Sequence, residues 1–414
     1  MNFYEEYRTM LDEYGLHERF LVDYIEKQAL EHNFVQFSPI KQCNHGDKFI
    51  FKFREKFITL VKIGKNVSDG ANVIVSHLDS PRLDVIVGEP LVEKPDGVFL
   101  KVVPYGGLIY QSWLDRPLAL VGKVDTENGV VDINTRGEFD FVITSLLPHL
   151  DGREEMANLK PETLAVRVGN NKKENILELL KERYGLVEED LQLADLSFVP
   201  SAEVREIGFD KDLIAGYGHD DKSCAFAELK AFFDAGDSDR TQIAIFASYE
   251  ETGSAQNTGC QSEFINDIFL EITGDIRLAR EGIRNSYVIS ADVCAGYEST
   301  YGSHFEDSAK TIVGHGVGIV PYLGRKGGND SEFQLRSWIK RLAKENEIKY
   351  SIETTKVSEG GGGTVSTFFA TKGCHVIDVG VPVLAMHSPQ EIISKVDLEE
   401  TYKLYKVFYE NVLK

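Results

Sequence analysis

The stretch Ser248-Tyr-Glu-Glu-Thr-Gly-Ser254 carries two adjacent glutamates, Glu250 and Glu251, at the end of an apolar run. That run, residues 241–247, has the composition of a buried strand, and a glycine turn follows it. Two carboxylates at the end of a buried strand are costly to desolvate, and open α/β sheets bind ligands at that position. The alternative is a solvated turn with two surface glutamates. Only the other motifs in the chain can distinguish this from a ligand-binding site.

Strand-like and helix-like segments alternate along most of the chain. The expected strands are 57–63, 71–75, 241–248, 285–291 and 374–379, and the expected helices are near 3–32, 222–235, 331–346 and 391–412. Strands that alternate with helices form parallel, helix-covered sheets. The sequence therefore predicts an α/β fold with a central, mostly parallel sheet. The glycine run 360–363 is expected to be a flexible loop.

The segment 88–203 has a different texture. It contains short β-type runs at 98–103, 118–124, 130–133 and 140–143, and one helical stretch near 172–184. The length of 414 residues also exceeds what one ordinary core needs. We therefore expect two domains, with residues 88–203 forming a mainly β domain inserted between the two parts, 1–87 and 204–414, of the catalytic domain.

The composition restricts the partners. The chain has 66 acidic and 45 basic residues and a formal net charge of −21, which argues against a nucleic acid or an anionic membrane as partner. No apolar window reaches membrane length, and the first residues do not resemble a signal peptide. The five cysteines lie far apart without a CxxC pair, as in reduced proteins. These features predict a cytoplasmic protein.

Acidic residues and histidines recur after other apolar runs. In chain order they are His77 with Asp79, Asp220 with Asp221, Glu250 with Glu251, Asp292, and His387. Each has an ordinary explanation, because an aspartate pair can cap a helix and a lone histidine is usually a satisfied buried one. In a parallel sheet, however, such turns gather along one edge. Together they supply ligands for two divalent ions, with positions left for water.

The same residues belong to longer motifs. These are 76–81, 105–107 with 113–116, 250–254, 290–292, and 378–380 with 386–388. In this order the chain resembles the aspartyl aminopeptidase/aminopeptidase I family, whose members are two-metal exopeptidases. The resemblance covers about residues 76 to 388 and implies a fold of the zinc-exopeptidase type.

The resemblance also implies a role for each residue. The first ion is expected on His77, Asp220 and Asp292, and the second on Asp220, Glu251 and His387. Asp79 is expected to orient His77, and Glu250 to be the general base. Related enzymes often have a cis peptide after the bridging aspartate, so we expect a cis or strained bond between Asp220 and Asp221. Histidine and carboxylate ligands fit Zn²⁺, and also Co²⁺ or Mn²⁺.

Two positions depart from the aspartyl branch of the family. Gln111 stands where that branch has a histidine thought to reach the active site of a neighbouring subunit, and Val293-Cys-Ala-Gly296 replaces histidines after the Ser-Ala-Asp motif. A glutamine can donate a hydrogen bond but cannot carry a proton or a charge. Neutral or apolar N-terminal residues are therefore expected as substrates, with acidic residues as the alternative.

The predicted function is removal of N-terminal residues from peptides by a two-metal aminopeptidase. One alternative is an N-acyl amino acid amidohydrolase, which uses the same ligand order but needs a group that binds the substrate carboxylate. Another is a non-catalytic metal-binding protein, which has no need of the spare Glu250. By resemblance, the inserted domain is expected to mediate assembly of a homo-oligomer, a dodecamer.

Overall fold

The computed structural model describes residues 2–38, 43–150, 152–170, 172–322, 328, 330–356 and 364–413. The chain forms two compact units. The first comprises Met1–Asp79, Val204–Met386 and Glu391–Lys414, and the second comprises Ser80–Glu203 and His387–Gln390. Residues 80–87, assigned to the first domain from sequence, fall in the second unit, where β5 (Arg82–Val85) pairs with β7 and β11. The predicted loop at 360–363 lies outside the described residues.

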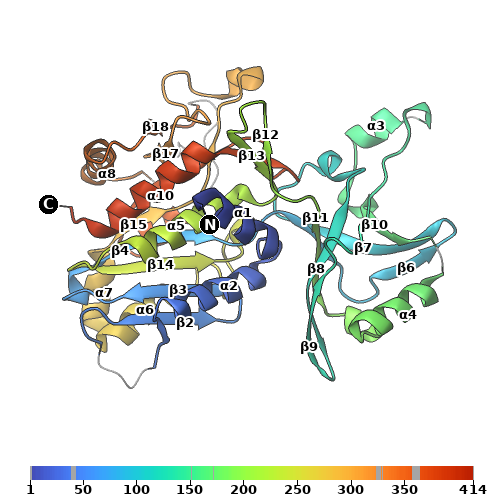
Figure 1. Ribbon diagram of the computed structural model, residues 1–414, viewed down its shortest axis with the longest axis horizontal. Helices are drawn as coiled ribbons and strands as arrows, with labels where there is room; N and C mark the ends of the chain where they lie inside the picture. Colours follow the sequence, from blue (N-terminus) through green and yellow to red (C-terminus); the bar gives the residue numbers. More distant parts are fainter. Residues whose placement is uncertain are drawn as a thin grey trace. The chain divides into compact units, whose positions relative to one another are not determined.

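The first unit is built on a mixed sheet that has nine strands within the described residues (Figure 1). Their order is β1 (Val35–Gln36), β2 (Lys48–Phe53), β3 (Phe57–Lys62), β14 (Thr241–Ala247), β4 (Ala71–His77), β15 (Tyr287–Ser290), β19 (His375–Gly380), β17 (Val317–Val320) and β18 (Tyr350–Ile352). The four central strands β14, β4, β15 and β19 are parallel, whereas β3 and β17 run antiparallel to them. The predicted mostly parallel sheet is confirmed.

Helices cover both faces of this sheet (Figure 1). One face packs against α1 (Phe3–Glu13), α2 (Glu18–Glu31), α5 (His219–Asp234), α8 (Phe333–Glu345) and α10 (Lys395–Glu410), and the other against α6 (Phe264–Thr273), α7 (Ile276–Arg284) and α9 (Ser366–Thr371). In β4, Ile74 faces the first set and Val73 and Val75 face the second. Burial on both faces explains why the central strands are continuous apolar runs.

Two of the predicted helices were wrong in extent: one is divided in two, and the other starts later than predicted. The segment 3–32 forms two helices, since the His17 side chain accepts the Arg19 N–H and starts α2. Residues 391–394 are not helical but form β21 (Glu391–Ser394), which pairs with β13 (Leu213–Gly216), and Ser394 caps α10. The described part of this unit also contains the short strands β12 (Arg205–Ile207), β16 (Cys294–Ala295) and β20 (Pro382–Val383).

The second unit is an antiparallel sheet, and its described residues also form the α-helices α3 (Gly152–Ala157) and α4 (Lys173–Tyr184). Its strands are β10 (Ala165–Gly169), β7 (Gly97–Tyr105), β5, β11 (Asp195–Pro200), β8 (Leu118–Thr126) and β9 (Gly129–Asn134), with β6 (Leu91–Lys94) on β7. The strand predicted at 140–143 was wrong, because Phe141 and Val142 make only isolated bridges. Side chains of α4 and the sheet line an apolar cavity of about 130 Å³.

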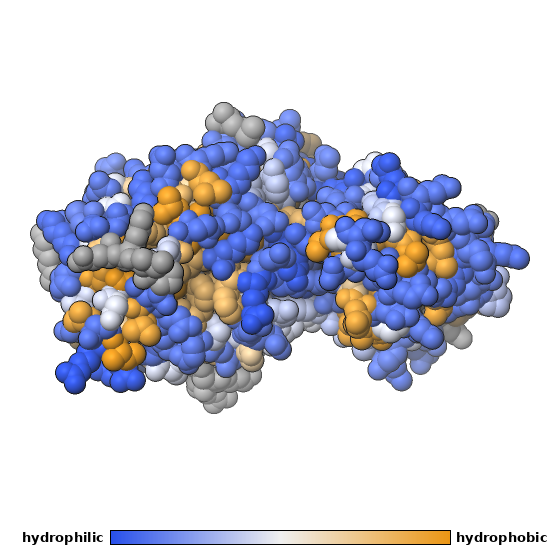
Figure 2. Space-filling view, turned by 90° about the horizontal axis from the view of Figure 1, so that it is seen from below, coloured by the Kyte–Doolittle hydropathy of each residue, from blue (hydrophilic) through white to orange (hydrophobic). Residues whose placement is uncertain are grey.

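The surface view in Figure 2 is mostly hydrophilic, with separate hydrophobic patches. Exposed apolar side chains include Phe209, Leu193 and Phe333. Among the described residues, no helix combines the length and apolar character needed to cross a membrane.

Candidate metal centre

The Glu250–Glu251 pair lies in a 3₁₀ turn, Glu250–Thr252, just after β14. The turn begins after Tyr249, whose φ of 62° is left-handed, and ends at Gly253 with φ 91°. The Asp79 carboxylate accepts the N–H of Glu250 at 3.3 Å and that of Glu251 at 3.2 Å. The turn and its hydrogen bonds to Asp79 therefore fix the backbone from which the two glutamate side chains leave.

His77 is the last residue of β4 and is the register partner of Ala247 at the end of β14. This pairing brings His77 and the glutamate turn to one edge of the sheet. His77 is 2% exposed. Its Nδ1 lies 3.0 Å from the backbone oxygen of Asp79 and 3.5 Å from the carboxylate Oδ1 of Asp79. The main chain of Asp79 is therefore nearer to the ring than its side chain.

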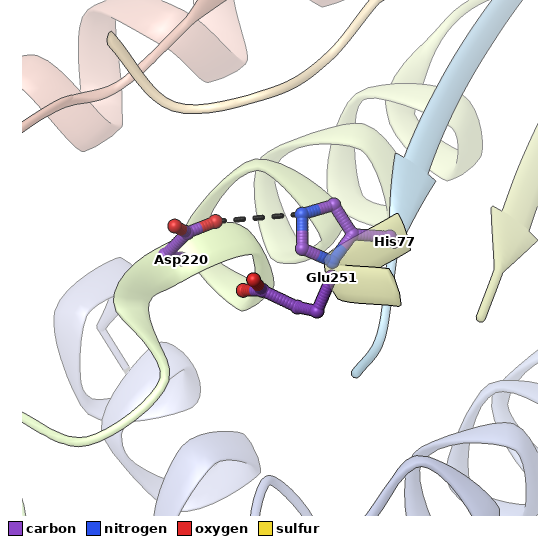
Figure 3. Close-up of side chains that lie close together, drawn as sticks. All are labelled: His77, Asp220 and Glu251. Carbon is purple, nitrogen blue, oxygen red and sulfur yellow. Dashed lines mark ion pairs between the residues drawn. The ribbon is translucent and has the colours of Figure 1, made fainter. Parts of the chain in front are cut away.

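The other ring nitrogen of His77 faces carboxylates. Nε2 lies 3.4 Å from Asp220 Oδ1 and 3.9 Å from Asp292 Oδ1. Figure 3 shows the Asp220 and Glu251 carboxylates turned toward the His77 ring, from the start of α5 and from the turn after β14. Three segments far apart in sequence thus meet at this ring.

The two aspartates at the start of α5 are held differently. Gly218 before them has the left-handed φ of 78°, and the Asp220–Asp221 peptide bond is cis, as expected. The Asp220 N–H donates to Glu391 Oε2 at 2.9 Å, whereas Asp221 Oδ2 accepts the backbone N–H of His77 at 3.1 Å. Asp220 therefore presents its carboxylate to His77, while Asp221 ties α5 to β4.

Asp292 follows β15 by two residues. Its carbonyl oxygen lies so close to Gly380, at the end of β19, that a Cβ built on Gly380 would be 1.9 Å from it. Only glycine permits this approach. The Asp378-Val-Gly380 motif thus has a packing reason, since it lets β19 lie against the chain that carries Asp292.

The described residues contain three groups of side chains that could bind a metal ion. Within each group, the potential ligand atoms all lie within 4.8 Å of one another. The groups are His77–Asp220–Glu251, His77–Glu250–Asp292 and Asp220–Asp221–Asp292. Imidazole nitrogen and carboxylate oxygen are the donors that zinc and related divalent ions take. The residues present therefore fit a divalent metal ion.

The other two predicted residues, His387 and Gln111, belong to the second unit. His387 Nδ1 lies 3.0 Å from the backbone oxygen of Gly107, and none of the ligand groups in the described residues includes His387. Gln111 is exposed and donates from Nε2 to the backbone oxygen of Met156 at 2.8 Å. Their predicted roles stay predictions.

The pKa values of Glu250, Glu251 and Asp221 are raised above their usual range. Burial, together with Asp292 and Asp79, raises the pKa of Glu250 to about 8. Burial and the neighbouring carboxylates also raise the pKa values of Glu251 and Asp221. Burial lowers the pKa of His77, but the hydrogen bond to Asp220 and further carboxylates raise it overall. Several buried carboxylates in one place favour binding of a cation.

Sequence reasoning missed Glu391, which is 1% exposed and accepts the Asp220 N–H. It was assigned to the start of a helix. The available signal was the apolar pair Ile392–Ile393 before Ser394, since a short apolar run ahead of a capping serine indicates a strand that ends where a helix starts. Buried Lys222, which lies 5.4 Å from the Tyr217 ring centroid, was also missed.

Comparison with known proteins identifies the family. The family described as "Aminopeptidase I zinc metalloprotease (M18)" matches residues 16–409. The chain belongs to the M18 family. The "Probable M18 family aminopeptidase 1" of Borrelia garinii is 36% identical over 440 residues, which covers 99% of this chain and 95% of that protein. This M18 chain is therefore an aminopeptidase of the zinc metalloprotease type, and the resemblance noted from its motifs is confirmed.

Solved structures agree with the fold. The crystal structure of an M18 family aminopeptidase from Thermotoga maritima has a TM-score of 0.92 and 32% identity, and the match covers 99% of this chain and 96% of that one. The structure described as the S. cerevisiae mApe1 dodecamer has a TM-score of 0.82 and covers 98% and 96%, but at 18% identity it shows the fold alone.

Proposed function

We propose that this M18 aminopeptidase uses two divalent metal ions per subunit and Glu250 as general base. The observation that carries the proposal is the set of overlapping ligand groups in which Asp220 occurs with Glu251 and again with Asp292. A carboxylate shared in this way suits a ligand that bridges two ions. His77, Asp220 and Asp292 would hold the first ion, and Asp220, Glu251 and His387 the second, by the ligand order of the family resemblance.

Ions bound there would supply Lewis-acid chemistry, which makes water a better nucleophile at neutral pH and polarises the scissile carbonyl. Glu250 takes the proton from the attacking water and passes it to the leaving amine. The raised pKa of about 8 belongs to the metal-free site, and cations bound beside Glu250 would lower it, which leaves the carboxylate able to accept the proton. Asp79 holds the His77 ring through its backbone oxygen and the glutamate turn through its carboxylate.

Peptides are the proposed substrates, because the surplus of carboxylates in the site suits a free α-ammonium group. We propose neutral or apolar N-terminal residues as preferred, since Gln111 and the stretch 293–296 lack the histidines of the aspartyl branch. Acidic N-terminal residues are the alternative. Zn²⁺ is the proposed ion, with Co²⁺ or Mn²⁺ also suited to these ligands.

The assembly is also a proposal. We propose a homo-oligomer, a dodecamer, formed through the second unit and located in the cytoplasm. The support is the family resemblance and the dodecameric state stated for the yeast relative. Light scattering tests it, and a mass near that of one chain would contradict it.

A panel of aminoacyl chromogens (Leu, Met, Ala, Asp, Glu, Lys) with and without added metal ions tests the reaction. Metal-dependent release that is fastest for Leu, Met or Ala is the expected result. Fastest release from Asp and Glu would favour the acidic alternative. Hydrolysis of N-acyl amino acids with no release from the panel would favour the amidohydrolase.

A further inference from the structure

We propose that the buried ion pair of Glu18 and Lys56 is a positioning device for the turn that carries Glu250 and Glu251. The pair does not belong to the ligand groups described above. Its ammonium lies beside the Tyr249 ring, and the Lys56 backbone oxygen holds Ser248, so Lys56 contacts both residues that precede the glutamates. The inference rests on the proposed function, because it concerns the placement of the proposed base and metal ligand.

The pair lies in the interior of the first unit. Lys56 Nζ is 2.9 Å from Glu18 Oε1, and the side chains are 8% and 1% exposed. Glu18 opens α2, and Lys56 is the last residue of the turn between β2 and β3. Burying two charges has a desolvation cost that often equals or exceeds their attraction. The pair is therefore a poor source of stability, and its contacts with the segment that follows β14 suggest a positioning role instead.

Lys56 contacts the chain as it leaves β14. Its backbone oxygen accepts the Ser248 hydroxyl at 2.6 Å, and its ammonium lies 5.5 Å from the centroid of the Tyr249 ring, within range of a cation–π contact. Tyr249 has the left-handed φ of 62°. Non-glycine residues rarely adopt this conformation unless their surroundings impose it. Lys56 supplies such surroundings, and Glu18 compensates its charge.

The turn is thus held at two places. Asp79 accepts the backbone N–H groups of Glu250 and Glu251, and Lys56 fixes Ser248 and Tyr249 immediately before them. With both ends of the connection fixed, the glutamate side chains leave the backbone from a defined position. Partners that orient metal ligands commonly change metal affinity or activity by about 10- to 100-fold when removed.

The chain contains a matched control. Arg19 NH1 and Glu55 Oε2 are 3.0 Å apart and join the same two segments, each one residue along from the buried pair. Their side chains are 20% and 58% exposed. An exposed pair of this kind contributes little. Glu55→Gln therefore tests the loss of a charge between these segments without removing the charge beside Tyr249.

The test compares Lys56→Met, Glu18→Gln, the double variant that combines these two substitutions, Lys56→Arg and Glu55→Gln. The assays are steady-state kinetics on the aminoacyl panel and Zn²⁺ affinity by competition with a chelating dye. Lys56→Met and the double variant should lose about 10-fold or more in kcat with little change in KM, and about 10-fold in Zn²⁺ affinity. Lys56→Arg should retain both values within about 3-fold, because a guanidinium can also make the cation–π contact with Tyr249, and Glu55→Gln should match the wild type.

The double variant keeps the test decisive, because it removes both members of the pair and so leaves neither charge buried without the other. A double variant with the thermal stability, kcat and Zn²⁺ affinity of the wild type overturns the proposal. Failure of both Lys56→Met and the double variant to fold also overturns it, since the pair would then serve stability.

Glu250→Gln in the same assays separates this inference from the proposed function. If Glu250→Gln turns over like the wild type, the proposed base is wrong, and the Zn²⁺ affinities still decide whether Lys56 positions the turn. If Glu250→Gln is inactive while the double variant is fully active with normal Zn²⁺ affinity, only the positioning proposal fails.

Discussion

Asp220 donates its backbone N–H to Glu391 Oε2 at 2.9 Å, so the proposed bridging ligand is anchored by a carboxylate from β21. Glu391 is 1% exposed, and hydrogen bonds to a buried charged acceptor are stronger than those between neutral groups. The contact fixes the main chain at the start of α5, and thereby the origin of the Asp220 side chain.

Glu391→Ala should therefore weaken metal binding by about 10- to 100-fold. Glu391→Gln should bind more tightly than Glu391→Ala, because its amide oxygen still accepts the Asp220 N–H. Dye competition with Zn²⁺ measures both. Glu410→Ala is the control, since Glu410 accepts the Gly236 N–H at 3.2 Å at an exposed site. Zn²⁺ affinity of Glu391→Ala equal to that of the wild type would disprove the anchoring role.

Removal of metal should lower the melting temperature, because a ligand that binds only the folded state stabilises it, by about 2.7 kcal/mol at a free metal concentration 100 times Kd.

Asp292→Asn should raise the stability of the metal-free protein and reduce the stabilisation by metal. It removes one buried carboxylate from the cluster, which should stabilise the metal-free protein, and it removes a proposed ligand, which should weaken the metal effect. Scanning calorimetry with and without chelator checks this. Equal melting temperatures of the wild type with and without metal would contradict the expected stabilisation by metal.

Stability should also depend on pH through Glu353, away from the ligand groups. Burial raises its pKa to about 7, against the lowering effect of the Thr311 hydroxyl, which donates to it at 2.9 Å. The folded state then binds more protons than the unfolded state between about pH 4.5 and 7. This contribution to stability is present below that window and is lost as the pH rises through it, by up to about 1.4 kcal/mol per pH unit.

Glu353→Gln cannot titrate, so the stability difference between wild type and this variant should shift against the wild type as the pH rises from 4.5 to 7. Urea unfolding across this range measures the difference. The exposed Glu345→Gln provides the control. A difference that stays constant with pH would contradict the raised pKa.

The apolar cavity of the second unit offers a separate test of packing. Leu100, 6% exposed, lines this space of about 130 Å³ together with Leu120 and Ile133. Leu100→Phe should fill part of it and stabilise the protein by about 0.5–2 kcal/mol. The same change at Leu193, which is 86% exposed, should have little effect. Destabilisation by Leu100→Phe would mean that the space cannot accept the larger ring.

The sequence predicted the sheet well because burial on both faces imposes a simple apolar pattern on the central strands. The meeting of His77 and the glutamate turn at the ends of these strands was predictable as well, because it follows from the parallel pairing of β14 and β4. Once β14 and β4 are parallel neighbours, Ala247 and His77 fall in register, and the glutamate turn follows. Asp79 was named for its carboxylate, although its nearest contact with the His77 ring is through its backbone oxygen.

The contacts that depend on side chains from distant segments were not predictable. The apolar pair Ile392–Ile393 indicates a strand but not that Glu391 accepts the Asp220 N–H, because Glu391 and Asp220 are 171 positions apart. The Glu18–Lys56 pair joins a helix start to a hairpin turn and has no periodic signature. Helix limits were missed where capping by His17 and Ser394 decided them.

The most direct test of the central claim is Glu250→Gln, assayed for turnover and for bound metal on the same preparation. Glutamine keeps the size of the side chain but cannot take the proton from water. We expect two bound metal ions per subunit, a folded protein, and a loss of kcat of at least about 100-fold. Hydrolysis of the preferred aminoacyl substrate at the wild-type rate, with metal bound, would contradict it.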